Sequence, residues 1–489
     1  MASNQTIPST HQILEALREA RERTLELVAG LSDDQLIGPR LSIVNPLRWE
    51  IGHVGWFQEF WCLRHLHGEP TILTHGDSLY DSARVAHDTR WDLPLLSRPE
   101  TIAYLSRVLD RVITLNREPS DKQIDGYGQS YFLRLALFHE QMHAEAITYT
   151  RQTLGYPAPR FTGDAGVPAT NGTRSQEVAM RGSYAELTAS AARPQDLELR
   201  ESEAEAAVKS TPQEHAEKGR AEPLGDAYVP GGRFLLGESP GATFQFDNEL
   251  LPHEVEVAPF SISRTVTTNS EFLKFVWDGG YLNRDVWSDE GWRWRLAVGA
   301  QHPVYWHRDS AGQWLRRNFD QLVPLEARLP VIHVNWYEAD AYCRWAGRRL
   351  PSEAEWEMAA SCETARGGSR IESHKRAYPW GDDPPAPDRA NLDWRAMGCV
   401  EAEALPKGDS AFGCRQMIGN VWEWTSTEFG AYPGFAAGPY KEYSAPWFGD
   451  HKVLRGGCWA TRSLLIRNAY RNFYTPDRRD VLAGFRSAR

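Results

Sequence analysis

The stretch that decides the fold is YFLRLALFHEQMHAEAITY, residues 131–149. It contains no Pro or Gly and is rich in Leu, Ala, Glu and Met, which predicts a helix. His139 and His143 are four residues apart. Helical side chains at i and i+4 lie roughly 5–6 Å apart on one face, so both imidazoles can bind one metal ion. Imidazole binds Fe, Zn, Cu and Ni, so the pair alone does not identify the metal.

The five letters HEQMH, residues 139–143, also match the H-E-x-x-H signature of zinc hydrolases. In such an enzyme Glu140 is expected to act as the general base. A structural alternative is a partly buried helix face on which both imidazoles are satisfied by ordinary hydrogen bonds. The pair by itself leaves these interpretations open, so the surrounding chain has to decide.

The N-terminal part, residues 1–160, predicts an all-α four-helix bundle. Its apolar side chains recur at helical spacing, and the second helix begins at Asn45-Pro46, which predicts an Asn cap followed by Pro at the first helical position. Bundles build metal sites from side chains on facing helices. The predicted helices are residues 11–31, 45–66, 100–116 and a segment that contains 131–149, with an irregular crossover at 71–98.

The second predicted helix carries His53 among apolar residues. Alone, His53 is typical of a core histidine. Together with the pair on the fourth helix it predicts a three-histidine site with open coordination positions, the pattern of a catalytic metal. Four other histidines lie in or near the irregular crossover, where a ligand set is less rigid, so they rank below His53: His65, His67, His75 and His87.

Composition bounds the rest of the interpretation. The chain has 489 residues and a net charge of −11, which predicts two or three domains and argues against nucleic acid or an anionic membrane as partner. No run approaches 18 apolar residues and no apolar leader is present, so a soluble cytoplasmic protein is expected. The six Cys show no C-x-x-C pattern, which predicts reduced, buried thiols.

Residues 161–224 are polar and predict a linker, and residues 225–489 predict an irregular α+β domain. Seven ordered motifs make the latter resemble the formylglycine-generating, sulfatase-modifying-factor fold, which is similar to C-type lectins. The motifs are VPGGRFLLG (229–237), the segment 249–275, the segment 330–360, YPWG (378–381), GNVWEWT (419–425), RGGCW (455–459) and GFR (484–486). That family binds copper through two Cys, whose positions are here Thr461 and Ile466, so formylglycine generation is not expected.

A helical bundle joined to this domain resembles the hercynine-oxidising non-haem iron enzymes, the ergothioneine-type sulfoxide synthases and the selenoneine synthases, whose bundle is of the DinB type. The family's iron ligands match His53, His139 and His143, with Glu145 completing its H-x-x-x-H-x-E motif. The resemblance implies Fe(II), O2 and hercynine, which is trimethyl-histidine. Three imidazoles leave three octahedral positions for the hercynine imidazole, a chalcogen nucleophile and O2.

The resemblance also implies substrate-binding residues. Asn472 and Phe473 match positions that meet hercynine, and the Phe473 ring suits a cation–π contact with the trimethylammonium group, although a core aromatic is the alternative. Tyr474 stands where mycobacterial-type members carry the Asp that recognises γ-glutamyl-cysteine, so that co-substrate is not expected. Met142 replaces a frequent Gln and alters a polar contact near hercynine.

The crossover, residues 77–99, resembles the selenoneine-synthase branch, and Arg84 and Arg90 are candidates to face the co-substrate. We therefore predict C–Se bond formation between a selenosugar and C2 of hercynine. The alternative is C–S bond formation with cysteine or another thiol, in which a tyrosine supplies a proton. Tyr432 is the candidate donor, with Tyr440 and Tyr443 as alternatives. Other classes are a zinc hydrolase and a non-catalytic DinB/lectin-like binding protein.

Overall fold

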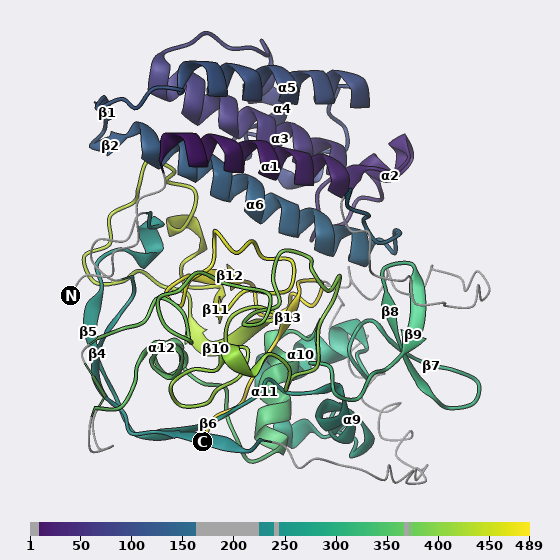
Figure 1. Cartoon of the computed structure of the whole chain (residues 1–489). Coiled ribbons are helices and arrows are strands. Elements are labelled where there is room, and N and C mark those ends of the chain that lie inside the picture. Colours follow the sequence, from purple (N-terminus) through teal and green to yellow (C-terminus); the bar gives the residue numbers. More distant parts are fainter. Residues whose placement is uncertain (1–8, 163–223, 239–243, 366–370, 373) are drawn as a thin grey trace. The chain divides into compact units, whose positions relative to one another are not determined.

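The computed structural model describes residues 9–162, 224–238, 244–365, 371–372 and 374–489. The chain forms two compact units (Figure 1). The described residues of the first are 9–162, Phe244 and 318–321, and the second contains the rest. The predicted linker, 161–224, falls almost wholly on residues 163–223, outside the described residues.

The first unit is a bundle of four long helices that lie side by side in Figure 1. α1 packs against α6, and α3 packs against both α5 and α6, which confirms the predicted helical bundle. The long helices are α1 (Thr10–Val28), α3 (Leu47–Glu59), α5 (Arg98–Leu115) and α6 (Gln129–Thr153). The shorter elements are α2 (Asp33–Ile37), the π-helical η1 (Phe60–His65), α4 (Gly76–Tyr80), η2 (His87–Thr89), β1 (Gln123–Ile124) and β2 (Tyr127–Gly128).

The helices α1, α2 and α5 begin at capping boxes, whereas α3, α4 and α6 have no side-chain cap bond. Ser9 and Ser32 cap α1 and α2 through capping boxes. The predicted Asn45 cap of α3 is wrong, because Pro46 occupies the N-cap position and makes no side-chain cap bond. The Asn45 side-chain oxygen, which a cap would need as an acceptor, instead accepts from Arg90 Nη1 at 2.6 Å, while the Asn45 amide nitrogen donates to the carboxylate of Glu50 at 2.7 Å.

A buried ion pair ties α1 to α6. Arg21 donates to Glu140 through Nε at 2.8 Å and through Nη2 at 3.2 Å, and both side chains are at most 4% exposed. Arg21 also donates to the Leu105 carbonyl and to Gln58. Since these contacts satisfy charges that would otherwise be desolvated without partners, the pair specifies how α1 sits on α6.

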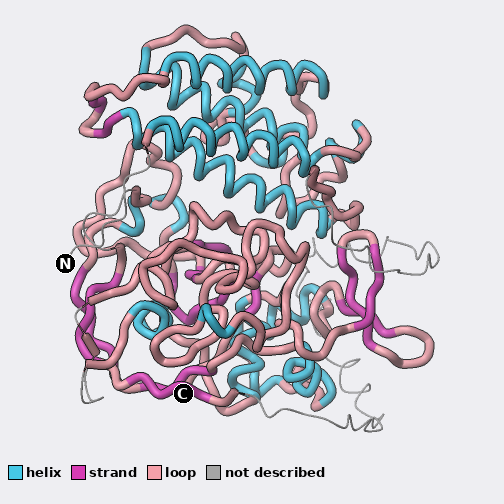
Figure 2. The backbone as a smooth tube through the Cα atoms, in the orientation of Figure 1, coloured by secondary structure: helices cyan, strands magenta, loops and turns pink. Residues whose placement is uncertain are grey.

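The second unit is dominated by loops, with short strands and helices between them (Figure 2). Its central sheet has the order β12-β11-β10-β13, in which only β13 runs parallel to its neighbour. These strands are β10 (Trp422–Glu428), β11 (Lys452–Arg455), β12 (Asn472–Tyr474) and β13 (Ala483–Gly484). An irregular α+β domain is what the motifs predict, and the structure confirms it.

Smaller sheets and helices surround this sheet. β3 (Asp226–Val229) pairs with β6 (Phe260–Ser263), β4 (Gly232–Leu236) pairs with β5 (His253–Val257), and a third sheet joins β7 (Trp306–Arg308), β8 (Trp314–Asn318) and β9 (Gln321–Pro324). The helices are α9 (Asn269–Trp277), α10 (Asp289–Val298), α11 (Trp336–Trp345) and α12 (Glu353–Ser361), with short turns η3 (Asp247–Glu249), η4 (Arg284–Val286), η5 (Pro406–Gly408) and η6 (Ala445–Trp447).

The GNVWEWT motif is a packing element. Gly419 has a φ of 85°, and a Cβ there would lie 2.5 Å from the Asn391 carbonyl oxygen, so the backbone approach requires glycine. Glu423 is fully buried and accepts from Trp356 Nε1 at 2.8 Å and from Nε and Nη2 of Arg486. The motif therefore holds loops together rather than presenting reactive groups.

Two further expectations concern the thiols and membranes. All six cysteines are free, five of them are buried and Cys399 is half-buried, so the predicted buried thiols are confirmed. Within the described ranges, none of the helices combines the length and apolar character that a membrane span requires.

We expect Glu140→Ala to lower the free energy of unfolding of the first unit by about 3–5 kcal/mol, because it leaves the Arg21 charge buried and unpaired. Chemical denaturation of the full chain followed by far-UV circular dichroism measures the change. The matched control is Glu15→Ala, which removes the surface partner of Arg18 and should cost less than about 1 kcal/mol. Equal effects of the two variants would contradict a specifying role for the buried pair.

Candidate metal centre

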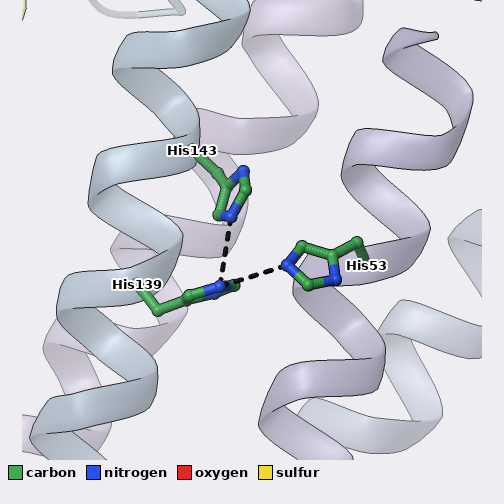
Figure 3. Close-up of side chains that lie close together, drawn as sticks. All are labelled: His53, His139 and His143. Carbon is green, nitrogen blue, oxygen red and sulfur yellow. Dashed lines mark hydrogen bonds between the residues drawn. The ribbon is translucent and has the colours of Figure 1, made fainter. Parts of the chain in front are cut away.

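Three histidine side chains from two helices of the first unit meet at one point (Figure 3). α3 supplies His53, and α6 supplies His139 and His143 one turn apart. His139 Nε2 lies 3.2 Å from His53 Nε2 and 3.1 Å from His143 Nε2. Among the described residues these three form a group whose ligand atoms all lie within 4.8 Å of one another.

The hydrogen-bond partners of Nδ1 decide which nitrogen carries the proton in the His53 and His143 rings. His53 Nδ1 lies 2.7 Å from the carbonyl oxygen of Tyr80, which can only accept, so Nδ1–H donates. His143 Nδ1 donates in the same way to Glu50 Oε1 at 2.5 Å. In the neutral rings, Nε2 of His53 and Nε2 of His143 are therefore bare lone pairs, and both face His139.

A cation fits this donor set better than hydrogen bonds do. The single possible N–H on His139 Nε2 can satisfy only one of the two facing lone pairs. A divalent metal accepts all three nitrogens, and a hydrogen bond from the outer nitrogen is what usually orients a metal-binding imidazole. Imidazole nitrogens suit Fe, Zn, Cu or Ni, so the geometry favours a metal without naming it.

Burial and aromatic packing keep the rings of His53 and His139 neutral and in place. Burial, followed by the charge of His143, lowers the pKa of His53 to about 3. Burial, followed by the charges of His143 and His53, lowers the pKa of His139 well below its ordinary value. The His139 ring stacks on Phe57 with centroids 3.5 Å apart, and the His53 ring stacks on Trp49 at 4.8 Å. Neutral rings leave their nitrogens available for a metal over the physiological pH range.

Glu50 was not singled out in the sequence, and it is the principal functional candidate that sequence reasoning missed. Burial raises the pKa of Glu50, but His143 and His53 outweigh that effect, so the pKa is lowered and the group is a carboxylate. Its side chain is 4% exposed on a helix whose other buried positions are mostly apolar. An acidic residue at position i−3 from His53 on a buried helix was the available signal.

Glu140, by contrast, is not directed at the histidines. Its carboxylate is bound by Arg21 and is 1% exposed. Adjacent helical residues point about 100° apart, so the residue after His139 cannot share its face. The general base that a zinc hydrolase needs is thus already committed to the bundle core, which argues against that alternative.

The four histidines that the sequence offers as alternative ligands lie in other surroundings. His67 Nε2 meets Asn116 Oδ1 at 3.0 Å, His87 Nε2 meets the Val44 carbonyl at 2.8 Å, and His65 Nε2 lies 3.8 Å from Asp125. His75 is the residue before α4. None of these four belongs to the metal-type group found in the described part of the chain, which agrees with ranking them below His53.

The residues of the first unit that are predicted to bind substrate differ in how deeply they are buried. Met142 precedes His143 and is half-buried. Arg84 is 68% exposed at its side chain and pairs with Asp81 at 3.0 Å. Arg90 is 9% exposed and its guanidinium lies over the Trp49 ring at 3.8 Å. The two arginines of the crossover therefore have different environments.

The two predicted hercynine residues, Asn472 and Phe473, and the predicted co-substrate residue Tyr474 are consecutive on β12 of the second unit. All three are half-buried, and β12 pairs with β11 so that Phe473 lies opposite Val453. The Phe473 ring stacks on Phe429 with centroids 4.0 Å apart. The Asn472 side chain accepts from the Phe473 amide at 2.8 Å, and Arg478 lies over the Tyr474 ring at 5.1 Å.

The candidate proton donors also lie in the second unit. Tyr432 is buried and its hydroxyl donates to Glu353 at 3.3 Å. Burial, and then the Glu353 charge, raises its pKa well above the ordinary value, so the phenol keeps its proton. Tyr443 OH lies 3.4 Å from Tyr470 OH, and Tyr440 is half-buried beside it. The choice of Tyr432 stays a prediction.

The positions of the family's copper cysteines are occupied by buried residues that cannot replace thiolates. Thr461 is fully buried, and its hydroxyl oxygen accepts from the Cys458 amide at 2.9 Å. Ile466 is also fully buried and has no metal-binding atom. The expected absence of a two-thiolate copper site at these positions thus follows from residues that fill the space.

Comparison with known proteins matches both units. Residues 212–489 match the sulfatase-modifying factor enzyme 1-like domain, and residues 16–147 match the DinB superfamily. The chain is 33% identical to a hercynine oxygenase of Mycolicibacterium thermoresistibile, over 99% of this chain and 95% of that protein. It is 33% identical to a hercynine oxygenase of Mycobacterium tuberculosis, over 98% and 99%. A formylglycine-generating enzyme of Streptomyces coelicolor is 32% identical over 54% of this chain and 88% of its own length.

We expect His53→Ala, His139→Ala and His143→Ala each to weaken metal binding by at least on the order of 100-fold, since even contacts outside the ligand set commonly change affinity 10- to 100-fold. Anaerobic Fe(II) titration against a chelating dye gives the affinity. His67→Ala is the matched control and should bind Fe(II) like the unaltered protein. Retention of Fe(II) by all three ligand variants would rule out this centre.

Proposed function

Since the chain belongs to the hercynine oxygenase family, we propose that its three-histidine group binds Fe(II) and that it is an O2-dependent, hercynine-oxidising enzyme. The observation that carries the proposal is the convergence of His53, His139 and His143 with two bare lone pairs. Family membership over nearly the whole chain supports the choice of iron over the other metals that suit imidazole.

When bound, Fe(II) supplies redox chemistry toward O2 and a template for the substrates. The chain's own residues do the rest. Glu50 and the Tyr80 carbonyl hold the imidazole protons on Nδ1, so Nε2 of each ring stays available. Burial of His53 and His139 keeps bulk water from protonating the ligands.

For hercynine, we propose recognition by β12. The trimethylammonium group has no hydrogen-bond donor, so it needs an aromatic face or oxygen dipoles. The Phe473 ring is held by stacking on Phe429 and can offer such a face, with Asn472 beside it. Met142, which precedes His143 on α6, stays a candidate substrate-binding residue of the first unit.

For the nucleophile, we propose a selenosugar and C–Se bond formation at C2 of the hercynine imidazole. Tyr474 has no carboxylate to pair with the ammonium of γ-glutamyl-cysteine, and Arg478 already occupies a face of its ring. The guanidinium of Arg84 is exposed and can donate hydrogen bonds to a hydroxyl-rich co-substrate, which does not require a fixed carboxylate clamp. In the thiol alternative, Tyr432 is the proposed proton donor and would have to release its bond to Glu353.

The function is tested by anaerobic Fe(II) reconstitution followed by O2, hercynine and either a selenosugar or cysteine, with products identified by mass spectrometry. We expect a selenium adduct of hercynine to form at a rate at least on the order of 10-fold above any sulfoxide, a difference of about 1.4 kcal/mol in activation free energy. Preferential sulfoxide formation would move the protein to the thiol branch. Fe(II) binding without either product would favour a non-catalytic binding protein.

We expect Phe473→Leu to raise the KM for hercynine roughly 2- to 30-fold, because a cation–π contact contributes about 0.5–2 kcal/mol. Steady-state kinetics at saturating O2 measure the change. Phe448→Leu is the matched control, since Phe448 also contacts the Phe429 ring, at 5.0 Å, and should leave KM unchanged. A similar rise in both variants would indicate a packing role for Phe473.

A further inference from the structure

A continuous chain of hydrogen bonds connects the crossover to a metal-site histidine. Arg90 Nη1 donates to Asn45 Oδ1 at 2.6 Å, and Asn45 Nδ2 donates to Glu50 Oε2 at 2.7 Å. The other carboxylate oxygen, Glu50 Oε1, accepts from His143 Nδ1 at 2.5 Å. Every link lies within the first unit and joins side chains that are partly or fully buried.

The same guanidinium also reaches the support of a second histidine. Arg90 lies 3.8 Å over the Trp49 ring, and Trp49 stacks on His53 with an interplanar angle of 9°. Arg90 Nη2 donates to the Val85 carbonyl at 3.2 Å, which fixes the guanidinium to its own segment. One arginine is thus built into the surroundings of His143 and of His53.

This arrangement orients Glu50. A carboxylate that is 4% exposed needs partners on both oxygens, and His143 supplies only one. Asn45 supplies the second and is itself held by the planar, always-charged Arg90 fork. Without Arg90 the Asn45 amide can rotate, and the carboxylate loses the partner that aligns it with His143.

We propose that Arg90 is a positioning residue of the metal centre, acting through Asn45 and Glu50 on the His143 ring rather than by contact with a co-substrate. The inference rests on the proposed metal centre and changes the role first predicted for Arg90. Arg84 lies on the same segment but differs from Arg90 in burial and in partner. Its side chain is 68% exposed and pairs with Asp81.

The test is Co(II) titration of the full chain without hercynine or O2, following the visible absorption of bound Co(II). We expect Arg90→Met and Glu50→Gln each to weaken Co(II) binding about 10-fold and to shift the absorption bands, as loss of an outer contact to a ligand usually does. Arg90→Lys keeps the charge but not the fork, so its affinity should fall between. Arg84→Met is the matched control and should bind Co(II) like the unaltered chain.

A double-variant cycle separates this chain of contacts from independent effects. If Arg90 acts through Glu50, the double variant Arg90→Met/Glu50→Gln should lose much less Co(II) affinity than the product of the two single fold-losses. Unchanged Co(II) affinity and spectrum in Arg90→Met, with a raised KM for the co-substrate, would overturn the inference and restore Arg90 as a binding residue. Should Arg90→Met fail to fold by circular dichroism, Arg90→Lys decides on the same criteria. Failure of the unaltered chain to bind Co(II) would instead overturn the metal centre itself.

Discussion

Two nitrogen lone pairs directed at one point are the constraint on which the bundle's chemistry depends. They exist because Nδ1–H of His53 donates to the Tyr80 carbonyl and Nδ1–H of His143 donates to the Glu50 carboxylate, both outside the centre. Had either ring turned over, its N–H would point at His139 and repel a cation. The candidate metal site is therefore specified as much by its outer hydrogen bonds as by its three imidazoles.

The crossover between α3 and α5 supplies much of this outer support. α4 lies on α3, where Trp49 Nε1 donates to the Leu79 carbonyl at 2.7 Å and His53 donates to Tyr80. Close approach is possible because position 52 is glycine, where a Cβ would lie 2.3 Å from the Tyr80 ring. A segment that the sequence predicts as an irregular crossover thus contributes the backbone carbonyls that hold Trp49 and His53 of the candidate metal centre.

The second unit solves a different problem, that of holding many loops in place with little regular sheet. Glu353 accepts from Arg455 at 2.9 Å and from Arg471 at 2.7 Å, all three being at most 3% exposed. Arg471 directly precedes β12, so the pair fixes the start of the strand that carries Asn472 and Phe473. Buried pairs of this kind add little net stability, but they disfavour other arrangements because each misplaced charge would lose its partner.

Local signals in the sequence determined the four long helices of the first unit and the pairing of His139 with His143, because these depend on residues three or four positions apart. The ordered motifs likewise determined the class of the second unit. Only tertiary structure decided the rest. The predicted Asn45 cap was wrong because the side-chain oxygen that a cap uses accepts from Arg90 instead, and the contact of Glu50 with His143 spans 93 positions. Arg90 joins the same chain across 45 positions. Such partners meet only when α3 packs on α6 and the crossover folds back beside α3, since nothing in the local backbone periodicity encodes which distant side chains will share a desolvated space.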